Sequence, residues 1–82
     1  MNSTFFELTE LVEKIKIKLD TMSPGSQADE LGEIGLHGML YLTMIEKGQD
    51  LSLEEQEQYF AVFDENVQTY LHLSRDFLKT LD

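Results

Sequence analysis

Residues 52–81, SLEEQEQYFAVFDENVQTYLHLSRDFLKTL, decide the fold. One stripe of mostly apolar positions in this stretch alternates spacings of three and four residues, which is the pattern of one side of an α-helix. The stripe consists of Phe60, Phe63, Val67, Tyr70, Ser74, Phe77 and Leu81, widened by Leu71 and Leu78. Ser52 followed by Glu55 is a capping box, and no Gly or Pro follows Ser52. The pattern predicts a single helix over about residues 53–81.

A shorter helical pattern opens the chain. Thr4 and Glu7 have the spacing of a capping box, and the apolar periodicity after them predicts a helix over about residues 4–22. Pro24 and Gly25 end this helix, because proline cannot continue it and glycine opens the turn. Its expected core stripe is Phe5, Leu8, Val12, Ile15, Leu19 and Met22.

The segment between these two predicts a helix over about residues 26–47, with Gly48 as its left-handed stop. Its expected core stripe is Ala28, Leu31, Gly35, Gly38, Leu42 and Ile45, flanked by Ile34 and Tyr41. Three glycines recur in its interior, and each costs roughly 1 kcal/mol relative to alanine. They are Gly32, Gly35 and Gly38. We interpret them as sites where this helix packs closely against residues 8–15, and a bend in the helix is the alternative. A leucine at position 35 should then lower the melting temperature sharply.

These segments and their short turns predict an all-α fold, a three-helix antiparallel bundle that forms one domain over residues 1–82. A chain of 82 residues without cysteine is near the lower size limit for a self-sufficient core. At 1.5 Å per residue the last helix should reach roughly 40 Å and the first only about 27 Å. Part of the long helix is therefore expected to lie uncovered.

Several apolar residues lie off the main stripes, where a monomer would expose them. They are Phe6, Ile17, Tyr59, Val62 and Leu73. Together with the length mismatch they favour a homodimer that completes the bundle, and they are the expected partner contacts. A monomer with scattered surface apolar residues and a dedicated second protein on that face are the alternatives.

The charge is strongly acidic, with sixteen acids, six bases and a formal net charge of −10. Residues 29–65 carry ten of the acids and a single base, Lys47. Such a field repels phosphate, so we expect no direct binding to nucleic acid or to an anionic membrane and expect a protein partner with a basic surface. The carboxylates expected to steer that partner are Glu54, Glu55, Glu57, Asp64 and Glu65.

Catalytic and metal chemistry find little support in the sequence. His37 and His72 each have a carboxylate four residues away, but the expected fold places the two imidazoles about 13 Å apart along the bundle. That excludes a shared metal site within one chain and leaves one between subunits open. Asp50 begins a pattern like a calcium loop, yet Glu55 stands where that loop requires glycine. There is no cysteine and no glycine-flanked nucleophilic serine. We therefore expect no cofactor, no metal and no enzymatic activity.

Targeting and membrane signals are also weak. No basic residue precedes Lys14, and the apolar stretch 39–45 is interrupted by Thr43 and is too short to cross a bilayer. A cytoplasmic location is expected, in the protein's own cell or in a host cell.

The sequence thus predicts a small acidic protein–protein interaction module: an adaptor, a chaperone-like subunit or an inhibitor. The alternative is a nucleic-acid mimic, a phage-type inhibitor whose carboxylates occupy the basic DNA- or RNA-binding groove of a defence or regulatory protein. Lys14, Lys16 and Lys18 argue against the mimic, because they place positive charge on the same small molecule.

Overall fold

The computed structural model describes the backbone of residues 2–81 and the side chains of residues 3–61 and 63–81. Its elements are α1 (Asn2–Thr21), α2 (Ser26–Gly48) and α3 (Leu53–Thr80), and the described residues contain no strand. The all-α prediction is confirmed.

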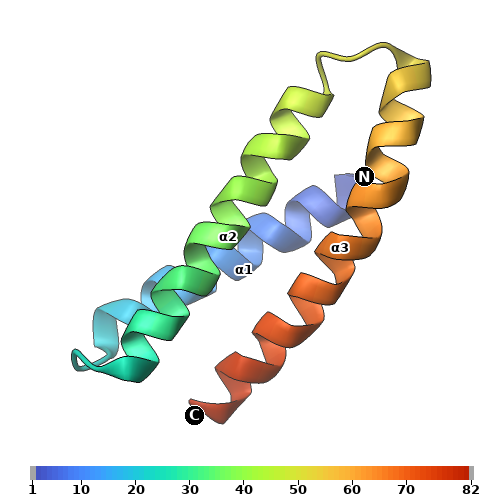
Figure 1. The fold of residues 1–82 in the computed structure, drawn as a ribbon. Coiled ribbons are helices and arrows are strands. Elements are labelled where there is room, and N and C mark those ends of the chain that lie inside the picture. The colour runs from blue at the N-terminus through green and yellow to red at the C-terminus, as the bar shows by residue number, and fades with distance from the viewer. Residues whose placement is uncertain (1, 82) are drawn as a thin grey trace.

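The helices pack into a rod of 46 × 19 × 18 Å. α2 and α3 run in opposite directions along the rod, and α1 crosses behind both of them (Figure 1). α1 contacts α2 most extensively, whereas α2 and α3 contact each other least. At one end, α2, the turn and the start of α3 extend beyond the start of α1 (Figure 1). The expected overhang of α3 is therefore present.

The core takes apolar side chains from all of these helices. Its buried members are Leu8, Leu11, Ile15, Leu31, Ile45, Phe63, Val67 and Leu71. Aromatic rings fill the space between α2 and α3, where Tyr41 lies 5.5 Å from Phe63 and 5.2 Å from Tyr70 between ring centroids. The Tyr70 hydroxyl donates a hydrogen bond to the Ile34 carbonyl of α2. Burial raises the pKa of this hydroxyl, because the tyrosinate would lose its hydration.

Thr4 does not cap a helix, contrary to the sequence prediction. α1 is already helical from Asn2, and the Thr4 side chain is buried. Its hydroxyl donates to Asp64 Oδ1 at 3.0 Å and accepts from Gln68 Nε2 at 3.4 Å. The prediction failed because a buried hydroxyl is satisfied across the interface with α3, and only packing supplies those partners.

Ser52 caps α3 as the sequence predicts. Its hydroxyl oxygen accepts the Glu55 backbone N–H at 3.3 Å and donates to Glu55 Oε1 at 2.8 Å. The Gln56 amide then donates to the carbonyls of Gln49 and Leu51, at 3.1 and 3.0 Å. These bonds fix the turn that joins α2 to α3.

Gly48 is not the left-handed stop that the sequence predicts. No described glycine has a φ in the left-handed region, and the following residue, Gln49, is in the right-handed helical region. A Cβ at position 48 would lie 2.5 Å from Phe60 Cζ. Gly48 is therefore needed because the Phe60 ring packs directly on the α2 backbone.

The glycines inside α2 divide into two kinds. A Cβ at Gly35 would lie 3.1 Å from Ile15 Cγ2, and one at Gly38 would lie 2.7 Å from both Val12 Cγ2 and the Tyr70 hydroxyl. A Cβ at Gly32 would have no neighbour within 4 Å. The close-packing interpretation is confirmed for Gly35 and Gly38, whereas Gly32 lies on the open side of the helix.

Candidate docking surfaces

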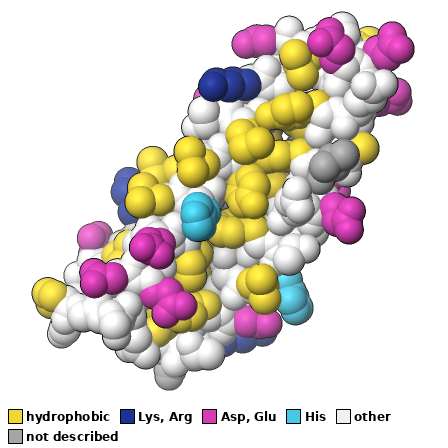
Figure 2. All heavy atoms as spheres, in the orientation of Figure 1, with side chains coloured by type: hydrophobic (Ala, Val, Ile, Leu, Met, Phe, Trp, Pro, Cys, Tyr) yellow, Lys and Arg dark blue, Asp and Glu magenta, His cyan; other side chains and the backbone are white. Residues whose placement is uncertain are grey.

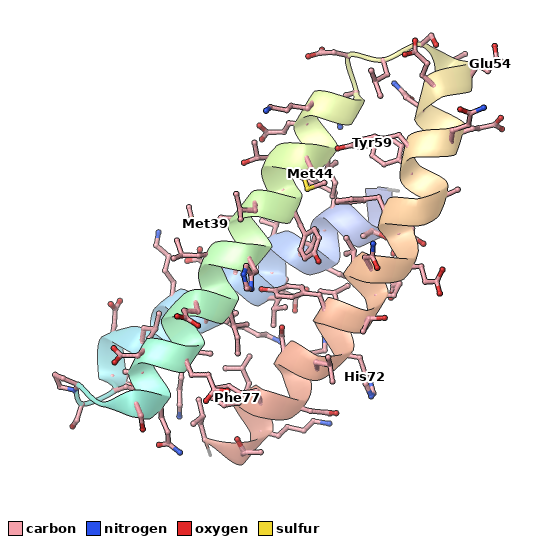
Figure 3. The ribbon with its side chains drawn as sticks, viewed as in Figure 1. Met39, Met44, Glu54, Tyr59, His72 and Phe77 are labelled. Carbon is pink, nitrogen blue, oxygen red and sulfur yellow. The ribbon has the colours of Figure 1, made fainter. Side chains whose placement is uncertain are left out.

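The side of α2 that faces away from the core is apolar. Leu36, Met39, Leu40 and Met44 are between 39% and 61% exposed, and we call these four residues the α2 apolar face. Hydrophobic side chains cover much of α2 in Figure 2. Met39 extends from the edge of α2 remote from α3, and Met44 lies on the edge beside Tyr59 (Figure 3). The α2 apolar face therefore occupies a broad arc of the helix.

Leu36 and Leu40 of the α2 apolar face lie within a regular line of exposed positions on α2, which we call the outer stripe. The stripe alternates spacings of four and three residues, and every member is exposed: Asp29, Glu33, Leu36, Leu40, Thr43 and Lys47. At the middle of this stripe α2 exposes Leu36 and Leu40, so the helix presents apolar side chains outside as well as toward the core. The sequence predicts only the inner stripe, because only two of the six outer positions are apolar. The signal for the α2 apolar face is the group of large apolar residues that lie outside the inner stripe, namely Leu36, Met39, Leu40 and Met44.

The partner contacts expected from the sequence are spread over α1 and α3. Phe6, Ile17 and Leu73 are exposed as expected. Phe6 and Ile17 lie about 16 Å apart along α1, and Leu73 lies on α3. The Val62 side chain lies outside the described residues.

Tyr59, the remaining expected contact, holds α3 to α2. Its ring stacks on Phe63 at 5.9 Å, and its hydroxyl donates to the Met44 carbonyl at 3.2 Å (Figure 3). The side chain is half-buried, so part of it packs within the fold, and its contact with a partner stays a prediction. The sequence placed it off the main stripe, but the aromatic packing between α2 and α3 extends to it.

The predicted steering carboxylates separate into free and structural groups. Glu54, Glu57 and Glu65 are exposed, and Glu54 projects from the overhanging end of the molecule (Figure 3). Acidic side chains gather at this end in Figure 2. Glu55 is exposed too but accepts the Ser52 hydroxyl. Asp64 is half-buried and accepts the Thr4 hydroxyl, so its carboxylate links α3 to α1, and the steering role expected for it stays a prediction.

A basic groove of about 620 Å³ runs between α1 and α3. Four of the six bases of the chain line it, namely Lys14, Lys18, Arg75 and Lys79, around the apolar side chains of Leu11, Ile17 and Leu78. Two acids also line it, and they pair with bases: Glu10 with Lys14 at 3.4 Å and Glu7 with Arg75 at 3.5 Å. The sequence does not predict this groove, because its bases come from α1 and α3 and Lys14 and Arg75 are 61 residues apart along the chain.

The histidines do not build a metal site in the described part of the chain. His72 pairs with Asp76 at 3.5 Å and points into solvent (Figure 3), and His37 is exposed on α2. Among residues 2–81, no three His, Asp or Glu side chains are grouped so that they could hold a metal ion. No helix in this part of the chain has the length and apolar character that crossing a membrane requires.

Comparison with known proteins returns nothing: no protein-family model, no curated protein and no solved structure matches this chain. The surfaces described above therefore carry the functional argument.

Proposed function

We propose that this chain is a small acidic protein–protein interaction module that works without catalysis, as an adaptor, a chaperone-like subunit or an inhibitor. The observation that carries the proposal is the α2 apolar face, formed by four large exposed side chains on one helix. Contiguous exposed apolar surface on a small folded protein is typical of a docking site. The residues proposed for contact therefore move from α1 and α3, where the sequence placed them, to α2.

The chemistry of the α2 apolar face suits a protein partner. Two of its four members are methionines, Met39 and Met44, whose flexible thioether chains adapt to irregular apolar surfaces. Burying these side chains against another protein removes apolar area from water, which is the main favourable term in most protein association. The charged members of the outer stripe, Asp29, Glu33 and Lys47, form a rim at both ends of the α2 apolar face.

The overhanging end supplies the electrostatic part of the proposal. Glu54, Glu55 and Glu57 are exposed on the first turns of α3, close in sequence to the exposed Glu46 and Asp50. Like charges gathered at one end attract a basic surface over several ångströms and raise the association rate. We therefore propose that the partner presents a basic surface to this end. We also propose that a second copy of the chain completes the three-helix bundle, and that the module acts in the cytoplasm of its own cell or of a host.

A nucleic-acid mimic is the second candidate, and the gathered carboxylates of the overhanging end favour it. The basic groove counts against it, since a molecule that substitutes for DNA or RNA in a basic site would meet repulsion from Lys14 and Arg75. The two candidates differ in which surface is essential for binding.

Two variants separate these surfaces in a capture experiment with tagged protein as bait in extract of the source cells. The double variant Leu36→Asp/Leu40→Asp should lose the partner that the wild type captures, because it places charge at the centre of the contact. Leu73→Asp, a matched control at an equally exposed leucine on α3, should retain it. Circular dichroism checks that both variants fold.

The triple variant Glu54→Lys/Glu55→Lys/Glu57→Lys tests the alternative. In a docking module it should weaken capture mainly at low salt, whereas in a mimic it should abolish capture at every salt concentration. Unchanged capture by Leu36→Asp/Leu40→Asp would contradict the proposal that the α2 apolar face binds the partner.

A further inference from the structure

We propose that the occupant of the α2 apolar face is a second copy of this chain, with the two α2 helices antiparallel across a two-fold axis near the level of residue 38. The inference rests on the proposed function in taking the α2 apolar face as a contact surface. It goes further in naming the occupant, the orientation and the register.

The spacing of the outer stripe is that of a helix–helix seam. Asp29, Leu36 and Thr43 are seven residues apart, as are Glu33, Leu40 and Lys47, and all six are exposed. Helices that pack through knobs and holes bury apolar residues at positions with this spacing, and in the outer stripe these are Leu36 and Leu40 at its centre. Within the described residues this stripe packs against no other helix, so the seam is available to another chain.

The charges of the stripe select the antiparallel orientation. Both acids, Asp29 and Glu33, lie at the N-terminal end of the stripe, and its base, Lys47, lies at the C-terminal end. An antiparallel pair centred at residue 38 places Lys47 of one copy opposite Asp29 of the other, and Leu36 opposite Leu40. A parallel pair would place acid opposite acid and lysine opposite lysine, which is destabilising.

The acidic ends of the molecule favour the same orientation. The turn that follows α2 leads directly to Glu54, Glu55 and Glu57. Two parallel copies would bring these carboxylates side by side in a protein of net charge −10, whereas antiparallel copies place them at opposite ends of the assembly. The antiparallel dimer thus keeps both acidic ends separate and free for a basic partner.

A two-fold contact is also self-complementary, as an isologous interface requires. Each copy contributes the same patch. A contact between one residue of the first copy and a different residue of the second copy, such as Asp29 with Lys47, therefore occurs twice. The remaining members of the α2 apolar face, Met39 and Met44, flank the seam on its two sides and close it against water (Figure 3).

Site-directed cross-linking tests the register. Because the chain has no native cysteine, each single-cysteine variant carries one reactive thiol. Asp29→Cys and Lys47→Cys are prepared separately, one with a tag, and treated with a short bis-maleimide reagent alone and after mixing. In the antiparallel dimer the two copies of position 47 lie about 27 Å apart, and so do the two copies of position 29. We expect cross-linked dimers only in the mixture. Cross-linked dimers of either variant alone would overturn the antiparallel arrangement.

Sedimentation equilibrium of the unmodified protein tests the occupant independently of the cysteines. The expected mass is twice the chain mass of 9.5 kDa, falling to one chain for Leu36→Asp/Leu40→Asp. A wild-type mass of one chain at all concentrations would overturn the inference. In that case, loss of partner capture by the same double variant would still support the proposed function, so the two can fail separately.

A charge exchange tests the ion pairing. Lys47→Glu should raise the dimer dissociation constant by about tenfold, since the pair occurs twice in each dimer and becomes repulsive. Adding Asp29→Lys to Lys47→Glu should restore most of the affinity. Failure of the second change to restore dimerisation would overturn the proposed register.

Discussion

Gly32 and Gly38 lie six residues apart on α2, and their different surroundings give them different effects on stability. Gly38 is buried between Val12 of α1 and Tyr70 of α3, while a side chain at Gly32 would meet nothing within 4 Å. Both carry the same conformational cost in a helix interior. At Gly38 the close approach of the helices offsets that cost, but within this chain nothing offsets it at Gly32.

Replacing each of these glycines by alanine should therefore have opposite effects on stability. Gly38→Ala should lower the free energy of unfolding by about 1–3 kcal/mol, because the new methyl group overpacks the contact with Val12. Gly32→Ala should raise it by up to about 1 kcal/mol through the better helix propensity of alanine. Urea unfolding measures both. Equal effects of the two changes would contradict the division of the glycines into buried and open.

Tyr70 should make stability depend on pH in the alkaline range. Burial raises its pKa in the folded state above the ordinary tyrosine value of 10.0, so the folded protein favours the neutral phenol. That contribution is fully present below about pH 10 and is lost as the pH rises through the folded-state pKa. Urea unfolding across this range should show the free energy of unfolding falling with pH more steeply for the wild type than for Tyr70→Phe. The same slope in both proteins would exclude Tyr70 as the cause.

At the scale of the helices, α3 is the element that the sequence predicts best. Its stripe is regular, its start has a capping residue, and nothing in its interior breaks it. Local signals that depend on a neighbouring helix fail: Thr4 has the spacing of a cap but bonds to Asp64, and Gly48 resembles a stop but accommodates Phe60. A single sequence cannot distinguish these cases, because the deciding atom belongs to a residue far along the chain.

Removing the cap of α3 should destabilise the protein without changing its fold. Ser52→Ala deletes the oxygen that accepts the Glu55 N–H and should lower the free energy of unfolding by about 1 kcal/mol. Ser52→Asp is the control, since aspartate accepts the same bond and should retain most of the stability. Thermal unfolding followed by circular dichroism gives both values. Equal losses in the two variants would show that the cap contributes little.

The candidate surfaces were predictable to different degrees, because some depend only on neighbouring residues in the chain and others depend on packing between helices. The acidic overhang follows from composition along the chain, and Glu54 and Glu57 are exposed there. The α2 apolar face was not predicted, because its four residues do not follow one line of helical spacing. The basic groove appears only when packing brings Lys14 beside Arg75.

At the scale of the whole molecule, this is a rod whose surface is divided by chemistry. One end is acidic, the groove between α1 and α3 is basic, and the outer side of α2 is apolar. Because four large apolar side chains are exposed on one helix of so small a chain, we propose that it is one component of an assembly. The proposed dimer covers that side and leaves both acidic ends accessible.

Photo-cross-linking in the source cells tests the central claim, that the α2 apolar face contacts another protein chain. A photoreactive phenylalanine derivative is placed at Leu40 and, as a control, at Leu73, which is equally exposed on α3. We expect protein adducts from position 40 and few from position 73, and we expect an adduct of two copies of this chain among the products. Adducts from position 73 and none from position 40 would contradict it.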